Sequence, residues 1–224
     1  MSPPPDQTGR PYGRGAFLLV LAGGLSSLVW ASPALRVLDS ILPGGARKLL
    51  PSQGWRIYTV AGTMPHFDPR SWRLRVDGLV ANPHEFGYDE LLRLPRAEQI
   101  SDFHCVTGWT VSNVRWAGVR FRDLLARAKP LPQAHALRFV SAEHPYEDTL
   151  TLEQALRTDA MLAYEMDGRP LSRPHGAPVR VVLPAMYGYK NVMWVERIEL
   201  VARPSDGFWE RLGYDRDAWV GSDA

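Results

Sequence analysis

Cysteine is nearly absent from this sequence: its 224 residues contain one, Cys105. A lone cysteine excludes an internal disulfide and any Cys-x-x-Cys zinc or redox pair. The chain also lacks a Gly-x-Gly-x-x-Gly dinucleotide turn, a P-loop, a His-Glu-x-x-His helix and a Gly-x-Ser-x-Gly nucleophile turn. Several common enzyme mechanisms are therefore excluded, and the search for chemistry returns to the surroundings of Cys105.

An excess of charge is absent too. The chain carries 26 Lys and Arg against 24 Asp and Glu, a formal net charge of +2, and its basic residues are scattered. We therefore expect no nucleic-acid partner. Proline and glycine, 19 of each, favour many turns and short strands over a helical bundle. Eight tryptophans indicate a deep core or an aromatic-lined pocket.

The N-terminal part of the chain differs from the rest. Residues 1–14 are polar and rich in Pro and Gly, which predicts a disordered tail. Residues 15–35 carry no charge and are numerous enough to cross a bilayer, so we expect a transmembrane anchor or a signal-like helix; a buried core helix is the alternative. A linker over 36–54 and a folded domain over 55–224 follow. The expected location is membrane-anchored on the extracytoplasmic side, with the cytoplasmic side as the alternative.

The folded part has the patterns of short strands and scattered helices. Apolar alternation or apolar runs predict strands over 72–76, 136–141, 179–183 and 192–201, and a hairpin of 161–166 with 169–171 around Asp167-Gly168. Helices are expected over 88–94 and 121–128, and from the capping box Thr151 to Gln154 as far as about residue 158. This mixture predicts an α+β, β-rich fold and not a series of βαβ repeats.

Two stretches hold the candidate chemistry. Cys105 lies between Asp102, His104, Thr107 and Trp109, a setting that favours a thiolate, the form that attacks or binds metal. The alternative is a small core residue.

In the second stretch, His175 and Arg180 flank a Gly-Ala-Pro turn, and Gly188 and Lys190 follow the next strand. Two cationic groups beside two glycine turns predict a site for a flat, anionic ligand. The alternative is a surface turn with an arginine at a strand edge.

Together these stretches resemble a known family. His-Gly-x-Pro-Val-Arg-Val-Val-x-Pro, then Gly-x-Lys-x-x-x-Trp, with Phe-His-Cys-Val-Thr-x-Trp upstream, is similar to the sulfite oxidase family of molybdopterin enzymes, above all its short prokaryotic members. The resemblance runs from about residue 58 to 219. It implies the molybdopterin-binding fold of that family, here preceded by the N-terminal hydrophobic helix, and molybdenum-molybdopterin as cofactor.

The resemblance also assigns the site. It implies that Cys105 is the thiolate ligand of molybdenum and a catalytic residue, with His104 beside it in a catalytic or supporting role. Cofactor contacts are implied for residues on three further segments, namely Thr63, Ser141, His175, Arg180, Lys190, Asn191, Val192 and Met193. His144, just past Ser141, is a weaker candidate for the pocket.

The implied activity is two-electron oxygen-atom transfer on a small oxyanion or an S- or N-oxide, with a haem protein or cytochrome exchanging the electrons. Animal and plant sulfite oxidases have an arginine in the first cofactor loop, where this chain has Ala61-Gly62-Thr63, so sulfite itself is not the expected substrate. Two alternatives stay open. One is a non-catalytic pterin-binding or docking module. The other is a hydrolase with Cys105 as nucleophile and His104 or His175 as base.

Overall fold

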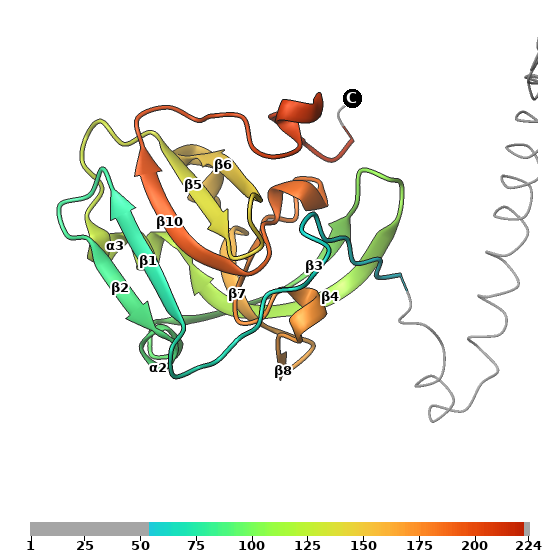
Figure 1. Cartoon of the computed structure of the whole chain (residues 1–224), viewed down its shortest axis with the longest axis horizontal. Coiled ribbons are helices and arrows are strands. Elements are labelled where there is room, and N and C mark those ends of the chain that lie inside the picture. The colour runs from blue at the N-terminus through green and yellow to red at the C-terminus, as the bar shows by residue number, and fades with distance from the viewer. Residues whose placement is uncertain (1–53, 222–224) are drawn as a thin grey trace, which may run out of the picture. The chain divides into compact units, whose positions relative to one another are not determined.

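The computed structural model describes residues 54–221 (Figure 1). The chain divides into two units, Met1–Gln53 and Gly54–Ala224. The predicted tail, hydrophobic helix and linker lie outside the described residues, and these predictions remain untested. Within 54–221, none of the helices has the length and apolar character needed to cross a membrane.

Two five-stranded sheets form the described part of the chain. The first has the order β2-β1-β10-β5-β6, in which β1 and β10 are parallel and the other pairs are antiparallel. Its strands are β1 (Arg73–Gly78), β2 (His84–Gly87), β5 (Ala136–Ser141), β6 (Glu147–Thr151) and β10 (Val195–Val201). The second has the order β3-β4-β7-β8, with β9 added to β7, and all its pairs are antiparallel. Its strands are β3 (Arg96–His104), β4 (Thr110–Arg120), β7 (Met161–Met166), β8 (Arg169–Pro170) and β9 (Arg180–Val182).

Short helices connect the strands. The described helices are α2 (Tyr88–Leu92), α3 (Phe121–Ala128) and α4 (Leu152–Ala155), with the 3-10 turns η2 (Arg173–His175), η3 (Gly188–Lys190) and η4 (Glu210–Leu212). Helix α3 buries Phe121, Leu124 and Leu125 on one face and ends where Lys129 takes φ 54° before Pro130. Figure 1 shows the β3–β4 hairpin reaching out from the strands of the first sheet, with the last segment of the chain in red beyond β5 and β6.

Around β7 and β9, the second sheet is covered on both faces. Leu162 and Val181 point into the main core, which they share with residues of the first sheet. Met161 and Val182 point the other way, into a smaller cluster with Trp116. Because side chains alternate along a strand, Arg180 lies on the same face as Val182, toward the smaller cluster. This alternation places a buried cation where the site is built.

Most of the predicted elements are present, and some of them have different ends. The β-rich mixed fold, the strand 136–141 and the helix 121–128 are confirmed. So are the capping box, in which Thr151 and Gln154 bond reciprocally, and the hairpin turn. The strand expected from 192 begins at Val195, because Trp194 has φ 51°, a left-handed conformation that a strand does not tolerate. The helix expected to reach 158 ends at Ala155, and the one expected to reach 94 ends at Leu92.

Candidate cofactor site

Cys105 lies at the tip of the β3–β4 hairpin, in a tight turn. Its backbone N–H donates to the carbonyl of Trp109 (2.9 Å), and the N–H of Gly108 donates back to the Cys105 carbonyl (3.0 Å). The Thr107 hydroxyl lies 3.2 Å from the sulfur, which is half-buried. Two backbone hydrogen bonds thus hold a partly accessible thiol in one place, as a metal ligand or a nucleophile requires.

The neighbouring His104 faces away from this position. Successive side chains of an extended segment point to opposite sides, so Phe103 and Cys105 share one side. Both line the cavity described below, whereas His104 does not. Its Nδ1 lies 3.0 Å from the Thr110 hydroxyl across the hairpin. The catalytic assignment of His104 stays a prediction, and this geometry favours a supporting role.

Arg180 is a buried cation without an anionic partner among residues 54–221. Its side chain is 1% exposed. It donates only long bonds, 3.3–3.5 Å, to the carbonyls of His175, Val181 and Asn191. Burial lowers the pKa of the guanidinium to about 10. Because an unpaired buried charge is costly, this geometry fits a site that receives an anionic group.

Three aromatic rings surround the same guanidinium. Its central carbon lies 5.1 Å from the ring centre of Phe103, 5.4 Å from that of Trp116 and 5.9 Å from that of Trp55. Such contacts offset part of the cost of burying the charge. They also exclude water from its surroundings.

His175 lies beside Arg180 with one nitrogen unused. Its Nδ1 lies 2.7 Å from the Ser172 hydroxyl, while Nε2 is buried and has no partner in the described part of the chain. Burial, and then the charge of Arg180, lower the pKa of the imidazole. The lowered pKa favours the neutral ring, and Nε2 is left without a partner among residues 54–221, although His175 is not among the residues that line the cavity described below.

One cavity of about 460 Å³ joins Cys105 to Arg180. Its walls come from an extended N-terminal segment, the β3–β4 turn, η3 with the loop after it, and the last segment of the chain. The absence of a side chain at Gly188 lets η3 lie close to the β3–β4 turn, since a Cβ there would stand 2.6 Å from the Phe103 ring. The thiol and the guanidinium, predicted from stretches some seventy residues apart, thus line one space.

The segment 190–193, for which the resemblance implies cofactor contacts, contributes only in part to this cavity. Asn191 and Met193 line it, but Val192 is buried in the main core. The Asn191 amide oxygen accepts from the Leu183 N–H (2.6 Å), and its nitrogen donates to two carbonyls, so the side chain fixes the loop. Ser141 does not line the cavity; its hydroxyl donates to the Met193 carbonyl (2.8 Å) and positions that wall.

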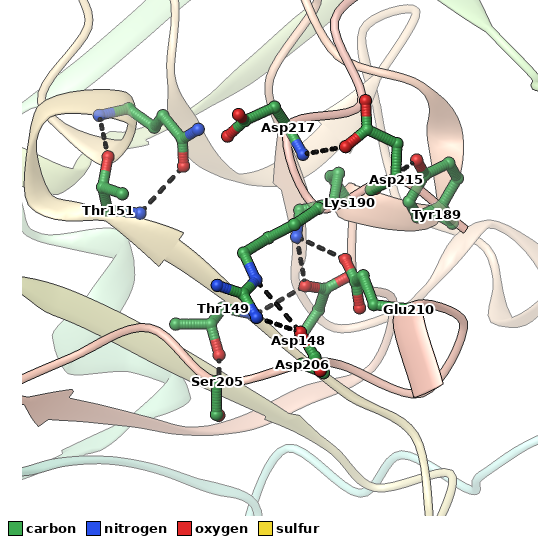
Figure 2. Close-up of polar contacts among 12 residues, drawn as sticks. Asp148, Thr149, Thr151, Tyr189, Lys190, Ser205, Asp206, Glu210, Asp215 and Asp217 are labelled. Carbon is green, nitrogen blue, oxygen red and sulfur yellow. Dashed lines mark hydrogen bonds and ion pairs between the residues drawn. The ribbon is translucent and has the colours of Figure 1, made fainter. Parts of the chain in front are cut away.

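Lys190 is bound to two carboxylates and does not line the cavity. Its ammonium lies 2.5 Å from Asp148 Oδ1 and 2.6 Å from Glu210 Oε1, and all three side chains are buried (Figure 2). The second oxygens of both carboxyls are buried without a partner in the described part of the chain. The cofactor contact expected of Lys190 stays a prediction; its observed contacts join η3 to β6 and to the last segment.

The first cofactor loop also differs from expectation. Thr63 is exposed and does not line the cavity; residues 55–60 do. Glu143 lines it as well and accepts hydrogen bonds from the N–H groups of Val60 (2.6 Å) and Ala61 (3.2 Å). Burial raises the pKa of this carboxyl. His144 points outward, 3.2 Å from Glu196.

Sequence reasoning missed Trp55 and Glu143. A tryptophan at the start of the folded part, and an acid two residues beyond Ser141, were the available signals.

These residues fit a molybdopterin. One accessible thiol, in its thiolate form, suits a metal that takes a single protein sulfur. An unpaired buried guanidinium and an unpartnered imidazole nitrogen suit an anionic, polar group. Aromatic walls suit a flat ring system.

Comparisons with known proteins agree with this fit. The family described as "Oxidoreductase molybdopterin binding domain" matches residues 61–209. The uncharacterized oxidoreductase YuiH of Bacillus subtilis (strain 168) is 35% identical over 161 residues, 70% of this chain and 81% of that protein. The protein-methionine-sulfoxide reductase catalytic subunit MsrP of Ralstonia nicotianae is 29% identical over 164 residues, 66% of this chain and 48% of that protein. In the crystal structure of the sulfane dehydrogenase SoxCD from Paracoccus pantotrophus, one chain matches with a TM-score of 0.60 and 25% identity, over 67% of this chain and 45% of that chain. The present chain therefore spans about half the length of the latter two relatives.

Proposed function

This chain belongs to the oxidoreductase molybdopterin-binding domain family, and we propose that it carries out two-electron oxygen-atom transfer on a small oxyanion or an S- or N-oxide. The membership confirms the resemblance predicted from the sequence and the predicted cofactor, molybdenum-molybdopterin. The reaction and the role of each residue are our proposal.

One observation carries it: the Cys105 thiol and the Arg180 guanidinium line the same cavity. We propose that Cys105 is the thiolate ligand of the metal. Arg180 and His175 then hold the anionic and polar end of the cofactor, because they offer an unpaired charge and an unpartnered nitrogen in a dry setting. Met193 and the backbone around Asn191 complete the cavity wall beside Arg180.

The bound cofactor supplies the exchange of an oxygen atom and two electrons. In the reducing direction, an S-oxide takes up two electrons and two protons and yields a sulfide and water. In the oxidising direction, an oxyanion gains an oxygen atom from water, and two protons and two electrons are released. The protein binds and orients the substrate beside Cys105, where Trp109 and Phe103 exclude water.

The electrons need an external carrier. We propose a haem protein or cytochrome that exchanges them one at a time. We also propose that residues 15–35 tether the chain to a membrane, with the folded domain on the extracytoplasmic side. Separation of membrane and soluble fractions, with protease accessibility of the domain in intact cells, tests the tether and its side.

A redox screen of molybdenum-loaded protein against sulfite, sulfoxides and N-oxides tests the activity. We expect turnover with at least one of these substrates in wild type, and none in Cys105→Ser, which should also lose molybdenum. His104→Ala is the matched control, because its side chain lies next to Cys105 but outside the cavity; it should retain the metal. Full molybdenum without turnover on any substrate would favour the non-catalytic pterin-binding module instead.

A thiol alkylation assay addresses the hydrolase alternative. A metal-bound Cys105 is protected from the reagent in loaded protein and becomes reactive once the metal is removed. Equal reactivity in the two states would contradict metal ligation.

A further inference from the structure

Thr107 lies in the same turn as Cys105 and brings a hydroxyl to its sulfur. The N–H of Gly108 donates to the Cys105 carbonyl (3.0 Å) and closes a β-turn, and Gly108 has φ 87°, a conformation that glycine adopts without strain. Within this turn the Thr107 hydroxyl lies 3.2 Å from the Cys105 sulfur. Both residues line the cavity, so the pair belongs to the candidate site.

The direction of this hydrogen bond follows from the state of the sulfur. A neutral thiol can donate its proton to the threonine oxygen or accept one from it. A thiolate has no proton, so Cys105 as a metal ligand can only accept, and the Thr107 hydroxyl must donate. Threonine suits this task, because its branched Cβ restricts rotation about χ1 and so limits where the hydroxyl points. No other side chain of residues 54–221 makes a hydrogen bond with this sulfur.

A hydrogen bond to a metal-bound thiolate changes the electron density at the metal. It draws density away from the sulfur, so the sulfur donates less to the metal. The oxidised metal needs this donation more than the reduced metal does, and it therefore loses more stabilisation. Hydrogen bonding at cysteine sulfur is among the factors that set the reduction potentials of iron–sulfur and blue-copper sites.

We propose that Thr107 is a positioning residue that acts on the cofactor through Cys105: its hydroxyl donates a hydrogen bond to the thiolate and raises the reduction potential of the bound molybdenum. This inference rests on the proposed function, because it takes Cys105 as the metal ligand. Since an external carrier exchanges the electrons, the hydroxyl then sets how readily that carrier reduces the metal.

Thr107→Val removes the hydroxyl and keeps the shape of the side chain, and at this exposed position it should leave the fold intact. Potentiometric titration of the molybdenum-loaded chain measures the effect. We expect the reduction equilibrium to shift about tenfold toward the oxidised metal, a fall of about 59 mV for a one-electron step, because hydrogen bonds to charged acceptors are the strong ones. Molybdenum per chain should stay at the wild-type value. Thr107→Ser keeps the hydroxyl and should recover most of the shift.

Thr110→Val is the matched control. Its hydroxyl is also removed from the β3–β4 hairpin, but it lies 3.0 Å from His104 Nδ1, and Thr110 does not line the cavity. This variant should have the wild-type potential and molybdenum content. If Thr107→Val does not fold, Thr107→Ala takes its place, because it removes the hydroxyl without adding an atom.

The outcomes separate this inference from the proposed function. An unchanged potential in Thr107→Val, with molybdenum lost from Cys105→Ser, overturns the role of Thr107 and leaves the metal ligand standing. A fall of the same size in Thr107→Ser also overturns it, since the hydroxyl is still present. Molybdenum lost from Thr107→Val to the same extent as from Cys105→Ser shows that the threonine only holds the turn, and overturns the effect on the potential. Equal molybdenum content and potential in wild type and Cys105→Ser overturn both the inference and the proposed ligand.

Discussion

Replacing Lys190 by methionine tests whether this residue stabilises the fold or binds the cofactor. Lys190 is 1% exposed, and its ammonium lies 2.5 Å from Asp148 and 2.6 Å from Glu210. Methionine fills a similar volume but leaves two buried carboxyl groups facing each other. We expect the substitution to lower the stability of the fold, because neither carboxyl has another cation within ion-pair distance in the described residues.

The magnitude follows from the burial of the three groups. Removing one partner of a buried ion pair costs about 3–5 kcal/mol. For a folded unit of this size, each kcal/mol lowers the melting temperature by about 2–4 °C, so we expect a fall of about 6–20 °C at pH 8. At pH 5 the two carboxyls can take up protons, and the loss should be smaller. Adding Asp148→Asn to the Lys190→Met chain should recover part of the stability, since it removes one of the facing charges.

Urea unfolding followed by circular dichroism at both pH values measures this effect. The matched control is Lys129→Met, an exposed lysine, whose stability should stay within about 0.5 kcal/mol of wild type. A Lys190→Met chain within about 1 kcal/mol of wild type at pH 8 would refute the account of the buried triad. A normal stability with lost molybdenum would restore the direct cofactor role predicted from the sequence.

Three further predictions follow from the structure. Burial raises the pKa of Asp148 from 3.8 to about 7, against the opposing effect of Lys190. Because the folded chain keeps a proton that the unfolded chain has released, the stabilisation by this group is present below about pH 4 and is lost as the pH rises through 7. Asp148→Asn should therefore flatten the dependence of stability on pH between pH 5 and 8, and an unchanged slope would contradict this expectation. Arg180→Gln should weaken retention of the cofactor at least about tenfold during dialysis, while the stability of the fold is kept. Molybdenum per chain measures the retention, and undiminished molybdenum would count against the anion site. Gly188→Ala places a Cβ 2.6 Å from the Phe103 ring, so it should lower the free energy of unfolding by about 1–3 kcal/mol and lower the cofactor content. In the control Gly87→Ala the new Cβ meets nothing within 4 Å, and neither quantity should fall. Equal melting temperatures of the two variants would refute the close contact.

Local patterns in the sequence predicted much of the fold. The helix over 121–128 has a strict apolar face and a proline beyond its end, and the capping box at Thr151 is a four-residue signal. Such elements are encoded within a single turn or a few residues, so no knowledge of tertiary contacts is needed. Cys105 and Arg180 were found for a related reason: a lone thiol and a cation in an apolar strand are conspicuous in the chain itself.

The longest strand pair was not predicted. Strands β3 and β4 have exposed residues at many of their alternate positions, such as Glu98 and Ile100, because the hairpin reaches away from the main core. An apolar pattern therefore fails to mark it. Because this hairpin positions Cys105, the location of the thiol in the fold could not be predicted from the sequence either.

The electrostatic partners were missed because they are distant along the chain. Glu143 holds the N–H groups of residues more than eighty positions away, and Lys190 meets carboxyls 42 and 20 positions away. The resemblance to the sulfite oxidase family implied a cofactor contact for Lys190. Only the folded chain reveals that two acids already satisfy its charge.

X-ray absorption at the molybdenum edge of purified, loaded protein tests the central claim most directly, because it counts the sulfur atoms bound to the metal. Any molybdenum retained by Cys105→Ser should have one sulfur ligand fewer than in wild type, while His104→Ala should keep the wild-type count. An identical sulfur count and molybdenum content in wild type and Cys105→Ser would contradict the assignment of this thiol to the metal.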